Sequence, residues 1–214
     1  MNGGPENFQV AEDFFTTPRN LLRNRANDRI RTPMSADHPK PRRTCPMLSN
    51  TRITALTLAA ASRDLPYPDG RPGRFLEAAA VTGLATRFAL PPRRVELAAL
   101  AAGICPLRYA RNLTAFSLAE QARLLQSKAG LIGLGGLGGG LLECLVRSGV
   151  GVIHAADGDV FEESNLNRQL LSRLSALGRP KAAIAAERAA AVNPSVEFVA
   201  RDVFLDRVGM EALL

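Results

Sequence analysis

A short cluster of glycines constrains the fold of this chain more than any other feature. Residues 133–138 read G-L-G-G-L-G and satisfy the pattern G-x-G-x-x-G, with glycines at Gly133, Gly135, Gly136 and Gly138. An apolar stretch, residues 129–134, precedes the cluster, and an amphipathic run, residues 137–148, follows it, which predicts a strand, a tight turn and a helix. Such a turn lets an anion approach free backbone N–H groups at the helix N-terminus. Alone, the pattern also fits a glycine-rich turn that binds nothing.

The sequence after the glycine cluster continues the same alternation. Residues 150–156 predict a second buried strand, and Pro180 predicts the first turn of another helix. Residues 195–200 alternate in the manner of a third strand, and a last helix is expected from about residue 205. This order predicts an α/β fold with a Rossmann-like parallel sheet, partial in this chain at about three strands.

The first half of the chain divides into two further regions. Residues 1–50 are rich in turn-forming residues and mixed charge, which predicts a disordered, basic and Pro-rich tail. Residues 51–107 contain alanine- and leucine-rich stretches between prolines and predict a small helical subdomain, with helices over 53–61, 74–90 and 95–104. The third region, 108–214, carries the α/β pattern, and Ser117 with Glu120 forms a capping box that predicts a helix start within it.

Composition narrows the possible functions. The net charge of +7 suggests nucleic acid, but only three of the 27 basic residues are lysine, so the excess is a general preference for arginine rather than a binding stripe. No apolar run reaches about 18 residues and no secretory signal is visible, which predicts a cytoplasmic protein without a membrane partner. The three cysteines are widely separated, so neither a disulfide framework nor a metal-ligating set is predicted.

An acidic residue follows the second predicted strand. Asp157 lies 19 residues beyond Gly138, where a carboxylate can accept hydrogen bonds from ribose hydroxyl groups. An NAD-dependent dehydrogenase fits these observations as well as an ATP-binding enzyme does.

The loop after Asp157 separates these two possibilities. It contains S-N-L-N-R-Q over residues 164–169 and G-R-P-K over residues 178–181. Arg168 can hold phosphate oxygens in a bidentate manner, and Lys181 can act on them as a point charge. A dehydrogenase does not need such a loop, whereas an enzyme that grips a triphosphate does. The loop therefore favours ATP.

Taken together, these motifs resemble those of the ThiF/MoeB/HesA family and of the adenylation domain of ubiquitin-activating enzymes. The resemblance rests on G-L-G-G-L-G, D-G-D-V, S-N-L-N-R-Q, G-R-P-K and N-P in this order and spacing, and it covers roughly residues 108–200. R-Y-A-R-N at residues 108–112 resembles the R-Y-x-R-Q motif of the family, with Asn112 where glutamine is usual.

The resemblance implies roles for individual residues. Gly136 and its neighbours would line the phosphates of ATP, and Asp157 would bind the ribose. The phosphates would be held by Asn165, Arg168 and Lys181, and Ser164 is a further cofactor-binding candidate that could instead cap a short turn. Arg111 would reach across a homodimer interface to the γ-phosphate of the ATP bound by the partner subunit. Arg168, Lys181 and Arg111 are thus the candidate catalytic residues.

The resemblance also implies a reaction. A carboxylate, typically the C-terminal Gly-Gly of a ubiquitin-like sulfur-carrier protein, would attack the α-phosphorus of ATP with Mg²⁺ and give an acyl-adenylate and pyrophosphate. A carboxylate on modified tRNA is a possible but less favoured substrate. The alternatives are an NAD(P)-dependent Rossmann oxidoreductase and a non-catalytic nucleotide-binding fragment. The family domain continues beyond the point where this chain ends, so we expect a C-terminally truncated domain that is inactive alone.

Several other residues have simpler interpretations. Asp159 is expected to order its loop rather than to bind a metal. Cys144 is expected to be a small apolar side chain within its helix. Tyr109 is expected to be a packing residue beside Arg111, and His154 a core or partner-facing residue in the second strand.

Overall fold

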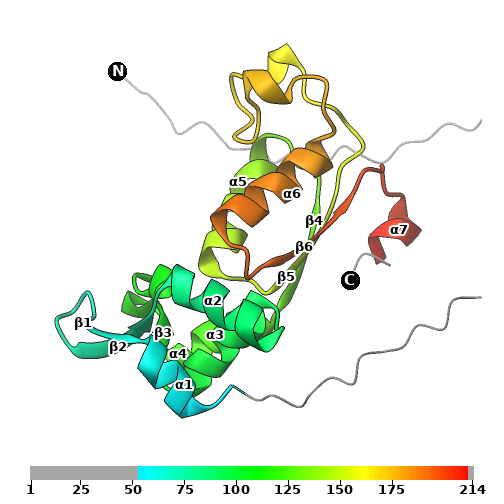
Figure 1. The fold of residues 1–214 in the computed structure, drawn as a ribbon. Coiled ribbons are helices and arrows are strands. Elements are labelled where there is room, and N and C mark those ends of the chain that lie inside the picture. The colour runs from blue at the N-terminus through cyan, green and yellow to red at the C-terminus, as the bar shows by residue number, and fades with distance from the viewer. Residues whose placement is uncertain (1–52, 212–214) are drawn as a thin grey trace, which may run out of the picture. The chain divides into compact units, whose positions relative to one another are not determined.

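The computed structural model describes residues 53–211, all within one structural unit, residues 47–214 (Figure 1). The predicted tail, residues 1–50, lies outside the described residues. In the described part, no helix is long and apolar enough to cross a membrane.

Residues 53–106 form helices around a small sheet. The helices are α1 (Ala55–Ala61), α2 (Ala78–Phe88) and α3 (Pro92–Ala101), and the strands are β1 (Arg63–Pro66), β2 (Pro72–Leu76) and β3 (Cys105–Pro106). Strand β2 pairs antiparallel with β1 and parallel with β3. The helices share an apolar core that includes Leu58, Val81, Val95 and Ile104.

The predicted helix over 74–90 was wrong at its start. Arg74 lies in strand β2, opposite Asp64 of β1, and the helix begins only at Ala78. Between the two strands, the N–H of Gly70 donates to the carbonyl of Tyr67 at 2.9 Å, and Gly70 has φ +84°. Glycine adopts this left-handed conformation without a steric cost. The prolines around this turn therefore mark a β-hairpin, where sequence reasoning saw only a break between helices.

Two short 3₁₀ helices and helix α4 connect this part to the second sheet. The 3₁₀ helices are η1 (Leu107–Tyr109) and η2 (Asn112–Thr114), and α4 spans Leu118–Gln126. The predicted capping box is confirmed, because the Ser117 hydroxyl accepts from the Glu120 N–H at 3.2 Å and the Glu120 carboxylate accepts from the Ser117 N–H at 2.8 Å.

The predicted parallel sheet is confirmed, with strand order β4-β5-β6. Strands β4 (Lys128–Ile132), β5 (Val152–Ala156) and β6 (Glu197–Arg201) run parallel. Helices α5 (Gly136–Ser148) and α6 (Lys181–Val192) connect them and lie side by side against the sheet (Figure 1). Two 3₁₀ helices, η3 (Glu163–Asn165) and η4 (Leu174–Ala176), lie in the long β5–α6 connection, and α7 (Arg207–Glu211) follows β6.

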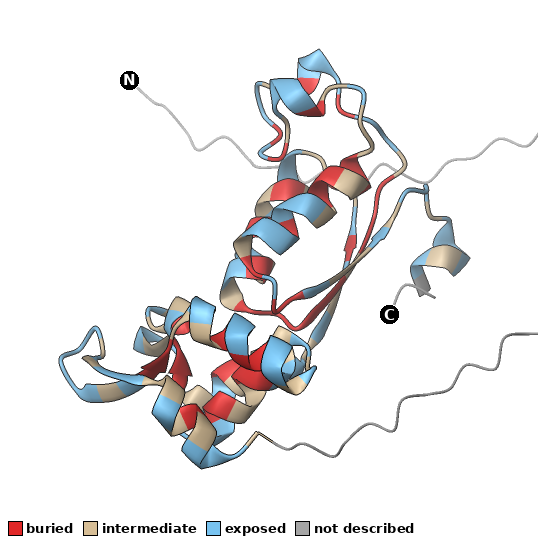
Figure 2. Cartoon of the chain, in the orientation of Figure 1, coloured by how far each residue is buried: buried red, intermediate tan, exposed pale blue. Residues whose placement is uncertain are grey.

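The core of this second part lies between the sheet and helices α5 and α6 (Figure 2). Leu142 and Val146 of α5 and Ile184 of α6 are at most 2% exposed. Leu141 of the same helix is 44% exposed. It precedes Leu142 by one position, and this rotates it away from the sheet.

Candidate functional site

The glycine turn between β4 and α5 has the geometry predicted from its sequence. Gly133 has φ +83°, and its N–H donates to the carbonyl of Ala156 at 2.9 Å. A Cβ added at Gly138 would overlap the carbonyl oxygen of Gly133, so only glycine fits there. The N-cap of α5, Gly135, has no side chain that could accept from the first N–H groups of the helix. These backbone donors therefore form a potential anion site at the positive end of the helix.

Asp157 joins the glycine turn to the loop after β5. One carboxylate oxygen accepts from the N–H of Leu134 at 2.6 Å, and the other accepts from the N–H of Asp159 at 2.8 Å. Asp157 is only 8% exposed. Its carboxylate therefore holds the glycine turn in place from within the protein, and its remaining lone pairs are what a ribose hydroxyl would have to use.

The loop predicted to hold phosphates is ordered by its own side chains. The amide oxygen of Asn165 accepts from the N–H of Glu162 at 3.0 Å, which closes the short helix η3. Asn165 is 7% exposed, whereas Ser164 and Arg168 are exposed. The guanidinium of Arg168 donates to the carbonyl of Ser164 at 2.7 Å. Asn165 thus shapes the loop. Among the candidate residues of this loop, Arg168 is the one whose charge lies at the surface.

The same loop folds back over the glycine turn. A Cβ added at Gly136 would lie 3.6 Å from the carbonyl oxygen of Arg168, and one added at Gly135 would lie 3.8 Å from the amide of Gln169. Gln169 is 8% exposed, and its Oε1 atom has no hydrogen-bond partner among the described residues. A buried amide without a partner is unusual in a folded protein. Sequence reasoning quoted Gln169 within its motif but assigned it no role.

Lys181 is held at the start of α6 against the same region. Its Nζ atom lies 2.9 Å from a carboxylate oxygen of Asp159, and its N–H donates to the Asp159 carbonyl at 2.9 Å. Lys181 is 6% exposed, with Nζ 6.0 Å from the centre of the Phe161 ring. The pair agrees with the expectation that Asp159 orders its loop. An incoming phosphate would compete with Asp159 for the ammonium group.

The donor set at this site suits an anionic ligand rather than a protein-held metal. Backbone N–H groups at the α5 N-terminus, Arg168 and Lys181 supply donors and positive charge. Within residues 53–211, no group of three or more histidine, cysteine, aspartate or glutamate side chains could hold a metal ion.

Arg111 lies at the opposite end of α5 from the glycine turn. The neighbouring Asn112 donates through its amide to the carbonyl of Ser148, the last residue of α5, at 3.4 Å and to Gln121 at 2.9 Å. The helix rises about 18 Å between Gly136 and Ser148. Arg111 is exposed, and none of the described residues pairs with its guanidinium. The structure therefore does not bring Arg111 together with the other candidate residues of its own chain.

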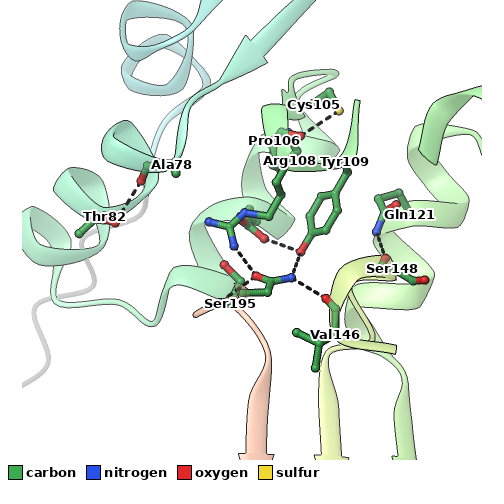
Figure 3. A network of polar contacts seen from close by, with 12 residues as sticks. Ala78, Thr82, Cys105, Pro106, Arg108, Tyr109, Gln121, Val146, Ser148 and Ser195 are labelled. Atoms are coloured by element: carbon green, nitrogen blue, oxygen red, sulfur yellow. Dashed lines mark hydrogen bonds and ion pairs between the residues drawn. The ribbon is translucent and has the colours of Figure 1, made fainter. Parts of the chain in front are cut away.

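A buried polar network anchors the segment that carries Arg111 (Figure 3). Tyr109 donates from its hydroxyl to the Glu96 carboxylate of α3 at 3.1 Å. The Asn193 amide donates to the same hydroxyl at 2.9 Å and to the carbonyl of Val146 in α5 at 3.0 Å. Arg108 donates to the Asn193 amide oxygen and lies 3.2 Å from the Glu96 carboxylate. Glu96, Tyr109 and Asn193 are at most 2% exposed.

Burial sets the acid–base behaviour of this network. It raises the pKa of Glu96 above the ordinary range, although the charge of Arg108 acts in the opposite direction. Burial and the nearby Glu96 carboxylate also raise the pKa of Tyr109, so its phenol stays protonated. The pKa of the Cys105 thiol rises to about 12 for the same two reasons, which makes it an unreactive thiol.

Of the simpler expectations, the one for Tyr109 is confirmed and the one for Cys144 is wrong. Tyr109 packs as expected, but it also donates and accepts hydrogen bonds in the network, which its position beside Arg111 in the sequence did not reveal. Cys144 is exposed rather than an apolar member of the core, because it lies on the outer side of α5. The N-P motif was noted without a role, and its asparagine, Asn193, turns out to join three segments distant in sequence.

Comparisons with known proteins find relatives that match part of this chain. A tRNA threonylcarbamoyladenosine dehydratase of Bacillus subtilis is 37% identical over 97 residues, 45% of this chain and 38% of that protein. The sulfur carrier protein ThiS adenylyltransferase of Escherichia coli is 38% identical over 96 residues, 44% of this chain and 38% of that protein. The chain thus spans less than two fifths of the length of these two relatives.

A solved structure and a family model complete the comparison. The E. coli tRNA N6-threonylcarbamoyladenosine dehydratase in complex with ATP has 27% identity and a TM-score of 0.45, with 46% of this chain and 41% of that chain covered. The family model that matches is described as the ThiF family, and it covers residues 109–213. Residues 109–213 of this chain are therefore similar to the ThiF family.

Proposed function

We propose that residues 109–213 bind ATP at the glycine turn and serve an adenylyltransferase. The single observation that carries this proposal is the folding of the S-N-L-N-R-Q loop onto the turn, with Arg168 and Gln169 against Gly136 and Gly135. In this proposal the N–H groups of the turn, the exposed Arg168 and the buried Lys181 supply donors and positive charge to one anion site. The name of the E. coli relative, an adenylyltransferase, supports the same activity.

Each residue has a distinct task in the proposed reaction. The α5 N–H groups and Lys181 hold phosphate oxygens, Arg168 neutralises their charge, and Asp157 keeps the turn rigid while it accepts from the ribose. Ser164 and Asn165 shape the loop that carries Arg168. Mg²⁺ bound to the phosphates would add further neutralisation.

The proposed chemistry needs no general base. The substrate carboxylate is ionised at neutral pH, so one of its oxygens attacks the α-phosphorus directly. A new bond from this oxygen to phosphorus forms while the bond from the α-phosphorus to the bridging oxygen breaks, and pyrophosphate leaves with that electron pair. The protein supplies orientation and positive charge, the two effects on which this kind of transfer depends.

The position of Arg111 supports a homodimer as part of the proposal. It lies about one helix length, roughly 18 Å, from the glycine turn of its own chain, and an arginine side chain cannot span that distance. An Arg111 that contacts a γ-phosphate must therefore belong to a second copy. A two-fold dimer would complete both sites with one isologous contact.

We propose a ubiquitin-like sulfur-carrier protein as the source of the carboxylate, through its C-terminal glycine. The sulfur carrier in the name of the E. coli relative supports this substrate. The dehydratase of B. subtilis, which acts on a modified tRNA by its name, favours a carboxylate on tRNA as the second candidate. A cytoplasmic location belongs to the same proposal, because ATP and both substrates occur there.

Titration calorimetry with ATP and NAD tests nucleotide binding. We expect ATP to bind and NAD not to bind. Lys181→Ala should weaken ATP binding at least about tenfold, because a charge-assisted contact is lost. Lys128→Ala is the matched control, since Lys128 is an exposed lysine of strand β4. NAD binding alone would support an oxidoreductase instead, and binding of neither would leave a non-catalytic module.

The substrate is tested by ATP–pyrophosphate exchange with this protein. The carrier protein should stimulate exchange, and the same carrier without its terminal glycine should not. Stimulation by tRNA alone would replace the carrier with the second candidate. No stimulation by either substrate would contradict both.

A further inference from the structure

We propose that Asn193 and Tyr109 are positioning residues for Arg111. The buried network that contains them fixes the backbone from which the Arg111 guanidinium reaches the nucleotide of a second copy. The inference rests on the proposed function, in which Arg111 contacts the γ-phosphate of a nucleotide bound by the partner. Neither Asn193 nor Tyr109 touches the nucleotide; both act through the backbone that carries Arg111.

Residues on both sides of Arg111 are tied to the last turn of α5, Tyr109 through Asn193 and Asn112 directly. On one side, the Tyr109 hydroxyl accepts from the Asn193 amide at 2.9 Å, and this amide also donates to the Val146 carbonyl at 3.0 Å. On the other side, the Asn112 amide donates to the Ser148 carbonyl at 3.4 Å. Carbonyl groups at a helix C-terminus lack partners within the helix. The segment thus caps α5, and Arg111 is held between its two attachment points.

The ring of Tyr109 adds a packing contact at the same place. A Cβ added at Gly149, directly after α5, would lie 2.7 Å from the Tyr109 ring and 2.9 Å from the Gln121 amide. Gln121 is fully buried and also donates to the Ser148 carbonyl at 2.9 Å. The ring therefore sits directly on the backbone of Gly149. Hydrogen bonds and packing together leave this segment little freedom.

Asn193 is the member of the network with the most connections. Its amide oxygen accepts from Arg108 and from the N–H of Ser195 at 3.2 Å, and its amide nitrogen donates to Tyr109 and Val146. At 2% exposure it has no access to solvent that could replace these partners. Asn193 follows α6, whose first residue is Lys181. One helix therefore carries a candidate phosphate-binding residue at its start and the anchor of Arg111 at its end.

Affinities for ATP and AMP in the full-length protein separate positioning from general folding effects, because AMP lacks the γ-phosphate. Arg111→Ala should weaken ATP binding at least about tenfold and leave AMP binding unchanged. Tyr109→Phe and Asn193→Ala should reproduce this pattern with smaller losses of about three- to tenfold. Tyr109→Phe keeps the ring and removes only the hydroxyl group, so it tests the idea even where Asn193→Ala folds poorly.

Glu143→Gln is the matched control, because Glu143 links α5 to Arg188 of α6 without touching the segment that carries Arg111. It should lower stability and leave the ratio of ATP to AMP affinity unchanged. An Asn193→Ala or Tyr109→Phe variant that weakens ATP and AMP binding equally, or neither, would overturn the inference. Failure of the proposed function is distinguishable, because in that case the unaltered protein would not bind ATP.

Mixing two variants in one sample shows whether a residue contributes to the nucleotide site of its own chain or to that of its partner. Lys181→Ala chains have a defective nucleotide site but an intact Arg111, whereas Asn193→Ala chains should have the reverse. A mixture of the two should recover tight ATP binding in a fraction of sites, and a mixture of Asn193→Ala with Arg111→Ala should not. Recovery in the second mixture, or absence of recovery in the first, would contradict the positioning role.

Discussion

A Cβ added at Gly138 would overlap the carbonyl oxygen of Gly133, and no side-chain movement can relieve a contact with backbone. We therefore expect Gly138→Ala to destabilise the fold by about 2 kcal/mol or more and to abolish ATP binding. Gly140→Ala is the control, because a Cβ at this position of the same helix meets nothing within 4 Å. The control should gain about 0.5–1 kcal/mol, since alanine is the better helix former. Urea unfolding measures both changes, and equal stabilities would contradict the prediction.

Two buried glutamates should give stability opposite dependences on pH. Burial raises the pKa of Glu96, so the folded state favours its protonated form, and this contribution is lost as pH rises from about 4.5 through the raised pKa. Hydrogen bonds from Arg188 lower the pKa of Glu143, so its contribution is lost as pH falls from about 4.5 through the lowered pKa.

Replacement by glutamine should remove each dependence separately. Unfolding free energies are measured from pH 3 to 8, a range that extends roughly one unit below and four units above ordinary glutamate pKa values. Glu96→Gln should lack the decline above about pH 4.5, and Glu143→Gln should lack the decline below it. If both variants kept the pH profile of the unaltered protein, neither carboxylate would contribute to the pH dependence of the unfolding free energy, and the prediction would be wrong.

The glycines that follow two helices show how much the cost of a substitution depends on the side chains packed around it. Gly149 after α5 and Gly103 after α3 both have positive φ, +84° and +76°. A Cβ at Gly103 would meet nothing within 4 Å, whereas one at Gly149 would lie 2.7 Å from the Tyr109 ring. Gly103→Ala should therefore cost only the backbone strain of about 1–2 kcal/mol. Gly149→Ala should cost about 1–3 kcal/mol more, because Tyr109 is fully buried and cannot move aside.

Thermal unfolding of the two variants checks this difference. A larger shift for Gly149→Ala would confirm that the segment around Tyr109 packs on the end of α5. Equal shifts would mean that backbone strain alone determines both positions, and that the contact with Tyr109 is easily relieved.

The elements that could be predicted are those whose signals are local. The apolar runs, the capping box at Ser117 and the glycine turn led to β4–α5–β5–α6–β6, because each signal lies within its own element. The hairpin before α2 was missed because its prolines are equally compatible with a break between helices. The network around Asn193 was missed for a different reason: Tyr109 and Asn193 are 84 residues apart, and no periodicity records such a pairing.

The candidate site shows the same division. The glycine motif, Asp157 and Lys181 could be singled out because their chemistry is visible in their spacing. That the amide oxygen of Gln169 is buried near Gly135 without a hydrogen-bond partner among the described residues follows only from the way the loop folds back. The distance between Arg111 and the glycine turn likewise follows from the length of α5 and from the contact of Asn112 with Ser148 at the C-terminal end of that helix.

Across the described molecule, polar contacts join two apolar cores. One core includes Val81 and Val95 of the first part, and the other includes Leu142 and Ile184 of the second. Asn193 connects them through Tyr109 and Arg108, and the Arg93–Glu197 ion pair at 3.1 Å lies nearer the surface. A buried, multiply bonded asparagine should couple the cores more strongly than an exposed ion pair, which contributes at most about 1 kcal/mol.

Hydrogen exchange followed by mass spectrometry can measure this coupling. In Asn193→Ala we expect amides of α2 and α3 to exchange at least about tenfold faster, while those of β5 change much less, because the first part can then open without the second. Arg93→Ala, the control, should change neither set by more than about threefold. Equal acceleration of both sets in Asn193→Ala would mean that the two cores unfold as one unit with or without the network. In that case the network would stabilise the whole molecule rather than hold one part against the other.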